Sequence, residues 1–236
     1  MTDGPSWFAK GAMWVSATLM LLGHTCGSPP GQLPKTFRWR ASPPLLRPCP
    51  LDGEHVYAFK DPSVVFHEGQ WHLFCTVRGQ QRSHAIAYFT FRDWNEAGQA
   101  QPKLLPNHEG YFCAPQVFYF RPHRRWYLIC QAADKKWQPN YRPAFAVAAR
   151  VDDPQAWSRL TPLEVSKPAE ARAWLDFWTI CDDHHAHLFF TSLDGKMWRA
   201  EAPLDKFPQG WSQPVLALQG DIFEASHVYR VRGGHA

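Results

Sequence analysis

Short apolar runs separated by polar turns recur along the chain from residue 35 onward. Runs of five to seven residues joined by loops that carry Gly, Pro or Asp predict β-hairpins. Further strands are predicted at residues 84–91, 144–151 and 196–202, each followed by an irregular segment that carries Trp94, Trp157 or Trp211. The clearest hairpins are residues 63–77 (SVVFH, EGQ, WHLFCTV), 116–131 (QVFYF, RPHRR, WYLICQ) and 177–192 (FWTIC, DDHH, AHLFFTS).

These units return at a regular spacing. A fourth begins at residue 226 with SHVYRV, and the four starts lie near residues 61, 114, 176 and 224, which are 53, 62 and 48 residues apart. A repeat of about this size with four short strands predicts the blades of an all-β propeller. The first strands (VVF, VFYF and FWTI) are apolar on both faces, as strands covered on both sides are. The alternative, a β-sandwich, would show stricter alternation and turns every 8 to 12 residues.

Composition and charge narrow the function classes. The chain has 236 residues, of which 45% are hydrophobic and 19% charged, so it is not mainly disordered, collagen-like or coiled-coil. Its 21 prolines and 15 glycines disfavour long helices. The net charge of +4 comes from scattered Lys and Arg residues, so no nucleic-acid binding is expected. The six cysteines include no pair spaced as in zinc motifs, so neither a zinc site nor a disulfide framework is expected.

The N-terminus carries a candidate export signal. Residues 11–22 (GAMWVSATLMLL) are uncharged, mostly apolar and too short to span a membrane, which is typical of a signal-peptide core. We expect residues 1–32 to be a signal peptide and linker, residues 33–236 to be the β domain, and the protein to be secreted. Lipid attachment at Cys26 would instead hold it at the cell surface. The remaining interpretation is a disordered tail with a chance apolar patch.

Three carboxyl groups stand in unusually apolar surroundings. Asp61 in FKDPSVVF, Asp176 in WLDFWTI and Glu224 in DIFEASHVY each come immediately before the first strand of a unit. First strands line the axis of a propeller, so the three acids are expected to share one pocket. A single such acid is usually a buried acceptor of backbone hydrogen bonds, but three are costly to bury for packing alone. Glycoside hydrolysis needs one carboxyl group as proton donor and another as base or nucleophile, and a third can tune the donor.

At these residues the chain resembles the glycoside hydrolase family 62 α-L-arabinofuranosidases, which are five-bladed propellers related to family 43. The resemblance runs from Leu33 to the C-terminus. It implies an inverting enzyme that removes arabinofuranosyl side chains from arabinoxylan. By the same resemblance Asp61 is the catalytic base, Glu224 the general acid, and Asp176 the acid that modulates the donor and positions the sugar. The most specific segments are AFKDPSVVFHEGQWHLF, YFCAPQVFYFRPHRRWYLICQ, HLFFTSLDGKMWRAEAPLDKFPQGW and DIFEASHVYRV.

The resemblance also suggests residues that bind substrate. Lys60 is similar to a contact of the arabinose ring, and Gln116 is a second candidate whose alternative role is hydrogen bonding within the sheets. Trp137 and Trp174 are candidates for stacking on a xylan main chain, with core or rim packing as the alternative. By the same resemblance, family members hold a structural calcium ion near the axis through a histidine that lies beyond the last residue of this sequence. No metal ligand is therefore assigned, and His227, close to Glu224, is more typical of a surface residue.

Two other functions stay open at this point. One is a family 43 type activity, xylosidase or arabinanase, and the other is a sugar-binding propeller without catalysis. Because the fourth unit stops after its first strand, the sequence predicts an incomplete five-bladed propeller of about three blades. Such a chain is expected to aggregate readily and to be weakly active by itself. We expect a monomer whose only membrane association is through a signal peptide or lipid anchor.

Overall fold

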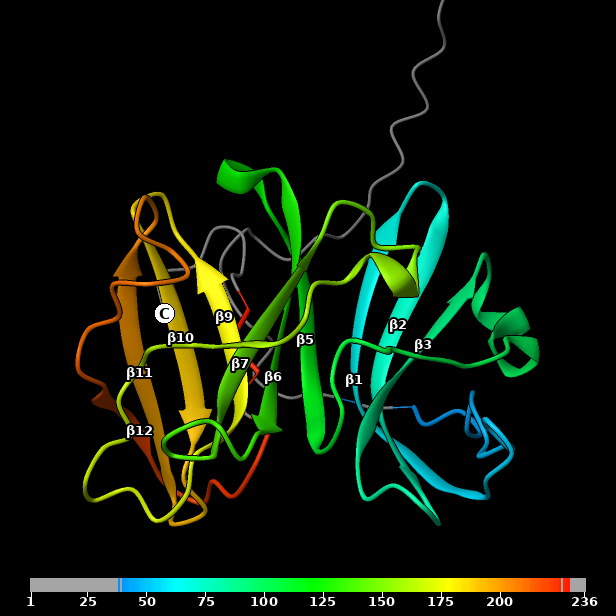
Figure 1. Ribbon diagram of the computed structural model, residues 1–236, viewed down its shortest axis with the longest axis horizontal. Helices are drawn as coiled ribbons and strands as arrows, with labels where there is room; N and C mark the ends of the chain where they lie inside the picture. Colours follow the sequence, from blue (N-terminus) through cyan, green and yellow to red (C-terminus); the bar gives the residue numbers. More distant parts are fainter. Residues whose placement is uncertain (1–37, 39, 226, 230–236) are drawn as a thin grey trace, which may run out of the picture. The chain divides into compact units, whose positions relative to one another are not determined.

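The structure, a computed structural model, describes residue 38, residues 40–225 and residues 227–229. These residues form an all-β fold of three four-stranded sheets, each built from one of the predicted units (Figure 1). The predicted signal peptide and linker, residues 1–32 with Cys26, lie outside the described residues. In the part of the chain that the structure describes, no helix is long and apolar enough to cross a membrane.

Each sheet is antiparallel and runs along the chain from an inner to an outer strand. The first sheet holds β1 (Val56–His67), β2 (Gln70–Gly79), β3 (Ala85–Phe91) and β4 (Lys103–Leu104). The second holds β5 (Phe112–Phe120), β6 (Arg125–Ala133), β7 (Tyr141–Ala148) and β8 (Thr161–Pro162). The third holds β9 (Leu175–Cys181), β10 (His185–Thr191), β11 (Lys196–Pro203) and β12 (Val215–Gln219). Short 3-10 helices lie in the connections: η1 (Trp94–Gln99), η2 (Arg121–His123) and η3 (Pro154–Ala156).

The predicted hairpins are confirmed, with differences at two strand ends. Each pairs as expected, and the tryptophan-bearing segments lead to the outer strands β4, β8 and β12. The strand predicted at residues 144–151 ends at Ala148, because the chain then turns toward η3, whose first turn is capped by the Asp153 side chain. Residues 227–229 of the predicted fourth-unit strand are not in a strand, and the rest of that strand lies outside the described residues.

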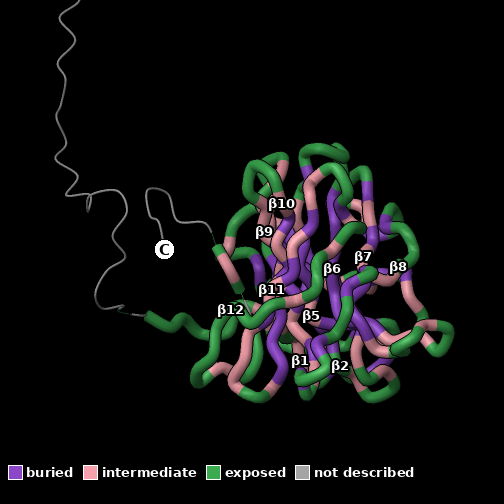
Figure 2. The backbone as a smooth tube through the Cα atoms, turned by 90° about the vertical axis from the view of Figure 1, so that its left-hand side faces the viewer, coloured by how far each residue is buried: buried purple, intermediate pink, exposed green. Residues whose placement is uncertain are grey.

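The sheets stack face to face. β5 contacts both β1 and β9, and Figure 1 shows it between them. Along β6, Leu128 and Cys130 belong to the buried cluster with the first sheet, whereas Tyr127 and Ile129 belong to the cluster with the third. Burial follows the strands and exposure follows the connecting loops (Figure 2). The second sheet is therefore covered on both faces, which is how propeller blades pack. The five-bladed ring that the resemblance implies stays a prediction.

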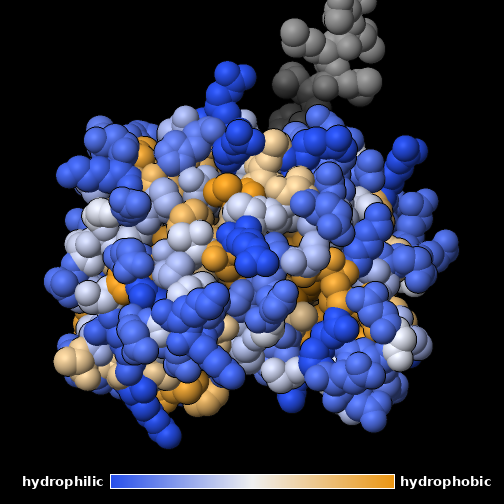
Figure 3. Space-filling view, viewed as in Figure 1, coloured by the Kyte–Doolittle hydropathy of each residue, from blue (hydrophilic) through white to orange (hydrophobic). Residues whose placement is uncertain are grey.

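One face of the molecule is polar apart from small areas. Figure 3 shows a face on which hydrophilic residues predominate and hydrophobic residues form separate patches. On β12, the outer strand of the third sheet, Val215, Leu216 and Leu218 are exposed, as is Phe223 just beyond it. Most apolar side chains of the described residues thus lie between sheets, and the outer edge of the third sheet is an exception.

A bulge at the same place in each first strand sets up the site. The pairing register of β1, β5 and β9 with the neighbouring strand shifts close to the start of each predicted unit. At each shift one residue other than glycine takes the left-handed backbone region, which is uncommon and costs about 1–3 kcal/mol. These residues are Asp61 (φ 53°), Ala114 (φ 50°) and Asp176 (φ 57°).

The bulges correct one sequence-based expectation. Asp61 and Asp176 were expected immediately before the first strands, but both lie inside them. A bulge leaves the extra residue unpaired while the ladder continues on both sides, so the strand does not have to begin after the acid. It also accommodates Pro62, which has no N–H to give to a ladder. Bulges redirect side chains, and here they aim the two acids out of the sheets.

Candidate active site

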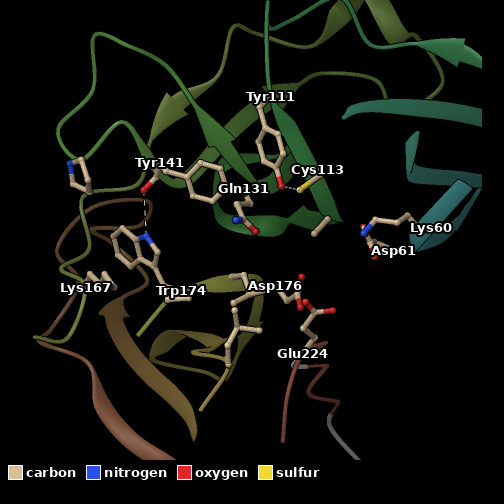
Figure 4. A pocket seen from close by; sticks show the side chains of 15 residues that line it. Lys60, Asp61, Tyr111, Cys113, Gln131, Tyr141, Lys167, Trp174, Asp176 and Glu224 are labelled. Atoms are coloured by element: carbon tan, nitrogen blue, oxygen red, sulfur yellow. Dashed lines mark hydrogen bonds and ion pairs between the residues drawn. The ribbon is translucent and has the colours of Figure 1, made fainter. Parts of the chain in front are cut away.

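The three predicted acids line one cavity of about 470 Å³. Asp61 comes from β1, Asp176 from β9, and Glu224 from the segment that follows β12. Figure 4 shows their side chains directed into the same space from separate elements. The same three acids also line a second cavity of about 250 Å³. Asp61 and Glu224, which are 163 positions apart in the sequence, thus lie in one cavity with Asp176. This is the arrangement expected from their places at the unit starts.

Asp61 is held through one of its two carboxylate oxygens. The hydroxyl of Thr76, on the neighbouring strand β2, donates a hydrogen bond to Asp61 Oδ2 at 2.7 Å. Lys60 Nζ lies 3.7 Å from the same oxygen, in a partly exposed ion pair. Asp61 therefore carries a compensated charge on one side of the cavity.

Asp176 is the acid most strongly affected by its surroundings. Burial raises the pKa of Asp176 above its usual value, and the negative charges of Glu224 and Asp61 act in the same direction. The backbone N–H of Ala225 donates to Asp176 Oδ2 at 2.7 Å, and this bond, with the charge of Lys60, opposes the rise. The net direction is upward, so Asp176 resists ionisation more in the folded protein than in the unfolded chain.

This raised pKa predicts that Asp176→Asn stabilises the protein at neutral pH. Ionising Asp176 costs more in the folded state, so the penalty grows as pH rises through the usual carboxyl range and is fully present above the raised pKa. Well below that range the carboxyl group is protonated in both states and the penalty vanishes. Asparagine removes the charge and keeps an oxygen that can accept from Ala225. Urea unfolding at pH 7 is expected to show a higher free energy of unfolding for the variant than for the wild type.

A matched control uses Asp205→Asn, which changes an exposed aspartate in the same way. The control is expected to unfold like the wild type at both pH values, and the advantage of Asp176→Asn is expected to disappear near pH 3. A variant at position 176 that is less stable than the wild type at pH 7 would show that burial is not the dominant effect there.

Glu224 stands outside any strand and is exposed. The residue after it, Ala225, has a left-handed backbone (φ 63°), and its N–H makes the hydrogen bond to Asp176. The segment that presents Glu224 is thus tied to the acid of the third sheet. In Figure 4 the carboxyl groups of Glu224 and Asp176 point toward each other, in line with their repulsion being one cause of the raised pKa of Asp176.

Of the predicted substrate contacts, Lys60 and Trp174 line the cavity. Lys60 is exposed beside Asp61 and can donate to a sugar hydroxyl. Trp174 is buried, with a relative exposure of 5%. Its indole N–H donates to the carbonyl of Tyr141, and its ring packs edge-on against Phe177. Trp174 therefore forms part of the cavity wall and offers a sugar little of its ring face.

Gln116 and Trp137 do not line the cavity of the acids. Gln116 is buried, donates through Nε2 to the carbonyl of Thr179 at 2.7 Å and accepts from the N–H of Thr179 at 2.6 Å. It thereby bridges the second and third sheets, which is the alternative role weighed from the sequence. Trp137 packs on the core cluster of the first two sheets and stacks on His108. In the structure these two side chains serve packing between and within sheets.

Several cavity residues were missed by sequence reasoning. Tyr111, Cys113 and Tyr141 form a wall with Gln131 (Figure 4). The thiol of Cys113 donates to the hydroxyl of Tyr111 at 3.1 Å, and burial raises the pKa values of Cys113 and Tyr141 to about 12 each. This wall is therefore neutral over the physiological pH range. A signal was available, because Tyr111 and Cys113 stand within three residues of Ala114, the equivalent of Asp61 in the second unit.

The resemblance implies a structural calcium ion, and no metal ligand was assigned to it from the sequence. Within the described part of the chain, no group of three or more His, Cys, Asp or Glu side chains is arranged to hold a metal ion. His227 lines the smaller cavity, but its ring stacks on Trp178 with 4.3 Å between centroids. The calcium ion therefore stays an expectation from the resemblance, and no chemical step rests on it.

Four-stranded sheets stacked as blades, with three carboxyl groups converging where their first strands meet, define a propeller of the glycoside hydrolase class. The family model described as glycosyl hydrolase family 62 matches residues 39–236. The chain therefore belongs to glycosyl hydrolase family 62.

Known members are similar in sequence and fold. The chain is 34% identical over 210 residues to α-L-arabinofuranosidase C of Cellvibrio japonicus (strain Ueda107), a match covering 86% of this chain and 31% of that protein. The solved catalytic domain of a family 62 α-L-arabinofuranosidase from Coprinopsis cinerea is 35% identical, with a TM-score of 0.75 over 84% of this chain and 63% of that one. A family 62 hydrolase solved in complex with xylotriose is 31% identical, with a TM-score of 0.65 over 74% of this chain and 57% of that one. The chain thus spans about a third of the length of the curated relative and about three fifths of the solved domain.

Proposed function

We propose that the protein removes α-L-arabinofuranosyl side chains from arabinoxylan by hydrolysis with inversion. The observation that carries this proposal is the convergence of Asp61, Asp176 and Glu224 in one cavity of a family 62 chain. The similarity to α-L-arabinofuranosidases supports arabinose as the sugar released, and a family member solved in complex with xylotriose supports a xylan main chain.

In this mechanism the two acids on either side of the sugar have different roles. Glu224, exposed to the cavity, gives its proton to the oxygen that leaves with the xylan chain. Asp61, held on Oδ2, accepts a proton from the water that attacks the anomeric carbon from the opposite side. Lys60, beside Asp61, is placed to donate to a hydroxyl of the bound arabinose.

Asp176 is the modulating acid in this proposal. Repulsion between its charge and that of Glu224 is among the causes that raise the pKa of Asp176. The same repulsion disfavours two charged carboxylates side by side, which is how a neighbouring acid can modulate a proton donor. Through the hydrogen bond from Ala225, Asp176 also fixes the backbone next to Glu224.

The remaining parts of the proposal concern the whole protein. We propose that it is exported, by a signal peptide within residues 1–32 or with a lipid anchor at Cys26, because a polymer of the plant cell wall is met outside the cell. We further propose that it acts as a monomer, since all three acids come from a single chain.

The substrate is tested by sugar release from three materials. Purified protein is incubated with wheat arabinoxylan, debranched arabinan and an aryl xyloside, and the products are separated by anion-exchange chromatography. We expect arabinose from arabinoxylan and little product from the other two. Release of xylose from the xyloside, or of oligosaccharides from arabinan, would favour a family 43 type activity. Binding of arabinoxylan without any release would favour a sugar-binding propeller.

A further inference from the structure

A buried polar residue stands at the same register position beside the bulge in every sheet. It belongs to the second strand and pairs with the residue just before the left-handed one. The pairs are Thr76 with Lys60, Gln131 with Cys113, and Thr191 with Leu175. All three second-strand residues are polar and buried, and both threonines have no exposed surface. Buried polar side chains at an equivalent position call for hydrogen-bond partners, so their contacts can be compared directly.

Thr76 makes two hydrogen bonds at this position. Its hydroxyl donates to Asp61 Oδ2 at 2.7 Å and accepts the backbone N–H of Ala114 at 2.8 Å. A threonine hydroxyl has one hydrogen, and an amide N–H can only donate. The bond from Ala114 therefore leaves the hydroxyl hydrogen for Asp61 and fixes its direction. Since Ala114 belongs to β5, the Asp61 carboxylate is anchored to the second sheet as well as to its own.

The two oxygens of Asp61 are consequently not equivalent. Oδ2 receives the bond from Thr76 and faces Lys60 Nζ at 3.7 Å. Among the described residues, Oδ1 takes part in no hydrogen bond or ion pair. An oxygen already bonded to a donor is a poorer proton acceptor than its partner, so the proton of an attacking water has a preferred destination.

We propose that Thr76 is a positioning residue that holds Asp61 by Oδ2 and leaves Oδ1 as the basic oxygen. This inference rests on the proposed hydrolysis. In that step the water oxygen bonds to the anomeric carbon as the bond to the leaving oxygen breaks. The proton lost by the water goes to Asp61 Oδ1, and the leaving oxygen takes the proton of Glu224, so atoms and charge balance.

Thr191 supplies a matched control. It occupies the same register position in the third sheet and is equally buried, but its hydroxyl oxygen has no hydrogen-bond partner among the described residues. Replacing either threonine with valine keeps the shape of the side chain and removes the hydroxyl. Only the change at position 76 removes a bond to an acid.

The test compares Thr76→Val, Thr76→Ser and Thr191→Val by kcat and KM for arabinose release and by crystal structures. Thr76→Val is expected to lower kcat by about 10- to 100-fold with KM changed less than about twofold, because the lost hydrogen bond orients the proposed base and does not contact the substrate. Its crystal structure is expected to show the Asp61 carboxylate rotated or in more than one rotamer. Thr76→Ser, which keeps the hydroxyl, and Thr191→Val are expected to match the wild type.

The outcomes separate this inference from the proposed function. An unmoved Asp61 in Thr76→Val, or a kcat equal to that of Thr191→Val, would overturn the positioning role. If Thr76→Val does not fold, Thr76→Cys takes its place, because a thiol is a weaker donor than a hydroxyl. Its kcat is expected to be lower than that of the wild type and of Thr76→Ser. A kcat equal to that of the wild type, with Asp61 in place, would overturn the inference. If wild-type protein releases no arabinose, the proposed function fails, and the crystal structures still test the anchoring of Asp61.

Discussion

Glu224→Gln is expected to lower the turnover of arabinoxylan by about 100- to 10,000-fold, the range for losing a general acid. Glutamine has the size of glutamate but cannot give a proton to the leaving oxygen. Because Glu224 is exposed and outside the strands, the substitution should leave the fold intact. The measurement is kcat on polymer beside an unfolding curve for the same preparation.

A substrate with a better leaving group distinguishes the loss of a proton donor from a general loss of activity in Glu224→Gln. An aryl arabinofuranoside whose phenol leaves without protonation is expected to recover much of the lost rate. Glu96→Gln, at an exposed glutamate in η1 of the first sheet, is the matched control and should behave as wild type. Near-normal activity of Glu224→Gln on polymer would assign the proton donor to another residue.

Asp61→Asn is expected to cause a loss of similar size, about 100- to 10,000-fold, that a better leaving group does not restore. Asparagine tolerates the left-handed backbone that position 61 requires, and its oxygen can still accept from Thr76. What it cannot do is take a proton from water. The measurement is kcat on arabinoxylan and on the activated aryl substrate.

The contrast between the two substrates is the decisive feature for Asp61. Recovery of Asp61→Asn on the aryl substrate to the extent seen for Glu224→Gln would contradict the division of roles. Asp205→Asn, an exposed aspartate outside the cavity, provides the control for the change of charge.

The hairpins and the meeting of the acids could be predicted from sequence, because both follow from local patterns. Apolar runs with polar loops fix a hairpin over a dozen residues, and equivalent unit starts converge in a propeller whatever the details of packing. Asp61 and Asp176 were found because a charge in an apolar context is conspicuous within a few residues of sequence.

Other features depend on contacts between distant segments. The left-handed backbone at Asp61 and Asp176 arises from pairing on both sides of a bulge, which no local pattern shows. Gln116 was expected to be either a substrate contact or a structural residue, and only its bonds to Thr179, 63 positions away, favour the second. The hydrogen bond from Thr76 to Asp61 likewise joins separate strands of a hairpin. Sequence placed polar residues near the site, and three-dimensional packing decides what they contact.

The most direct test of the central claim is the anomeric configuration of the first product. Arabinoxylan is digested in an NMR tube with enough protein to outpace mutarotation, and the anomeric proton signals are followed from the first minutes. The proposed roles of Asp61 as base and Glu224 as acid predict that β-L-arabinofuranose forms first and that the α-anomer grows in later. Formation of the α-anomer first would mean retention of configuration, which requires a carboxylate to attack the sugar and contradicts the account.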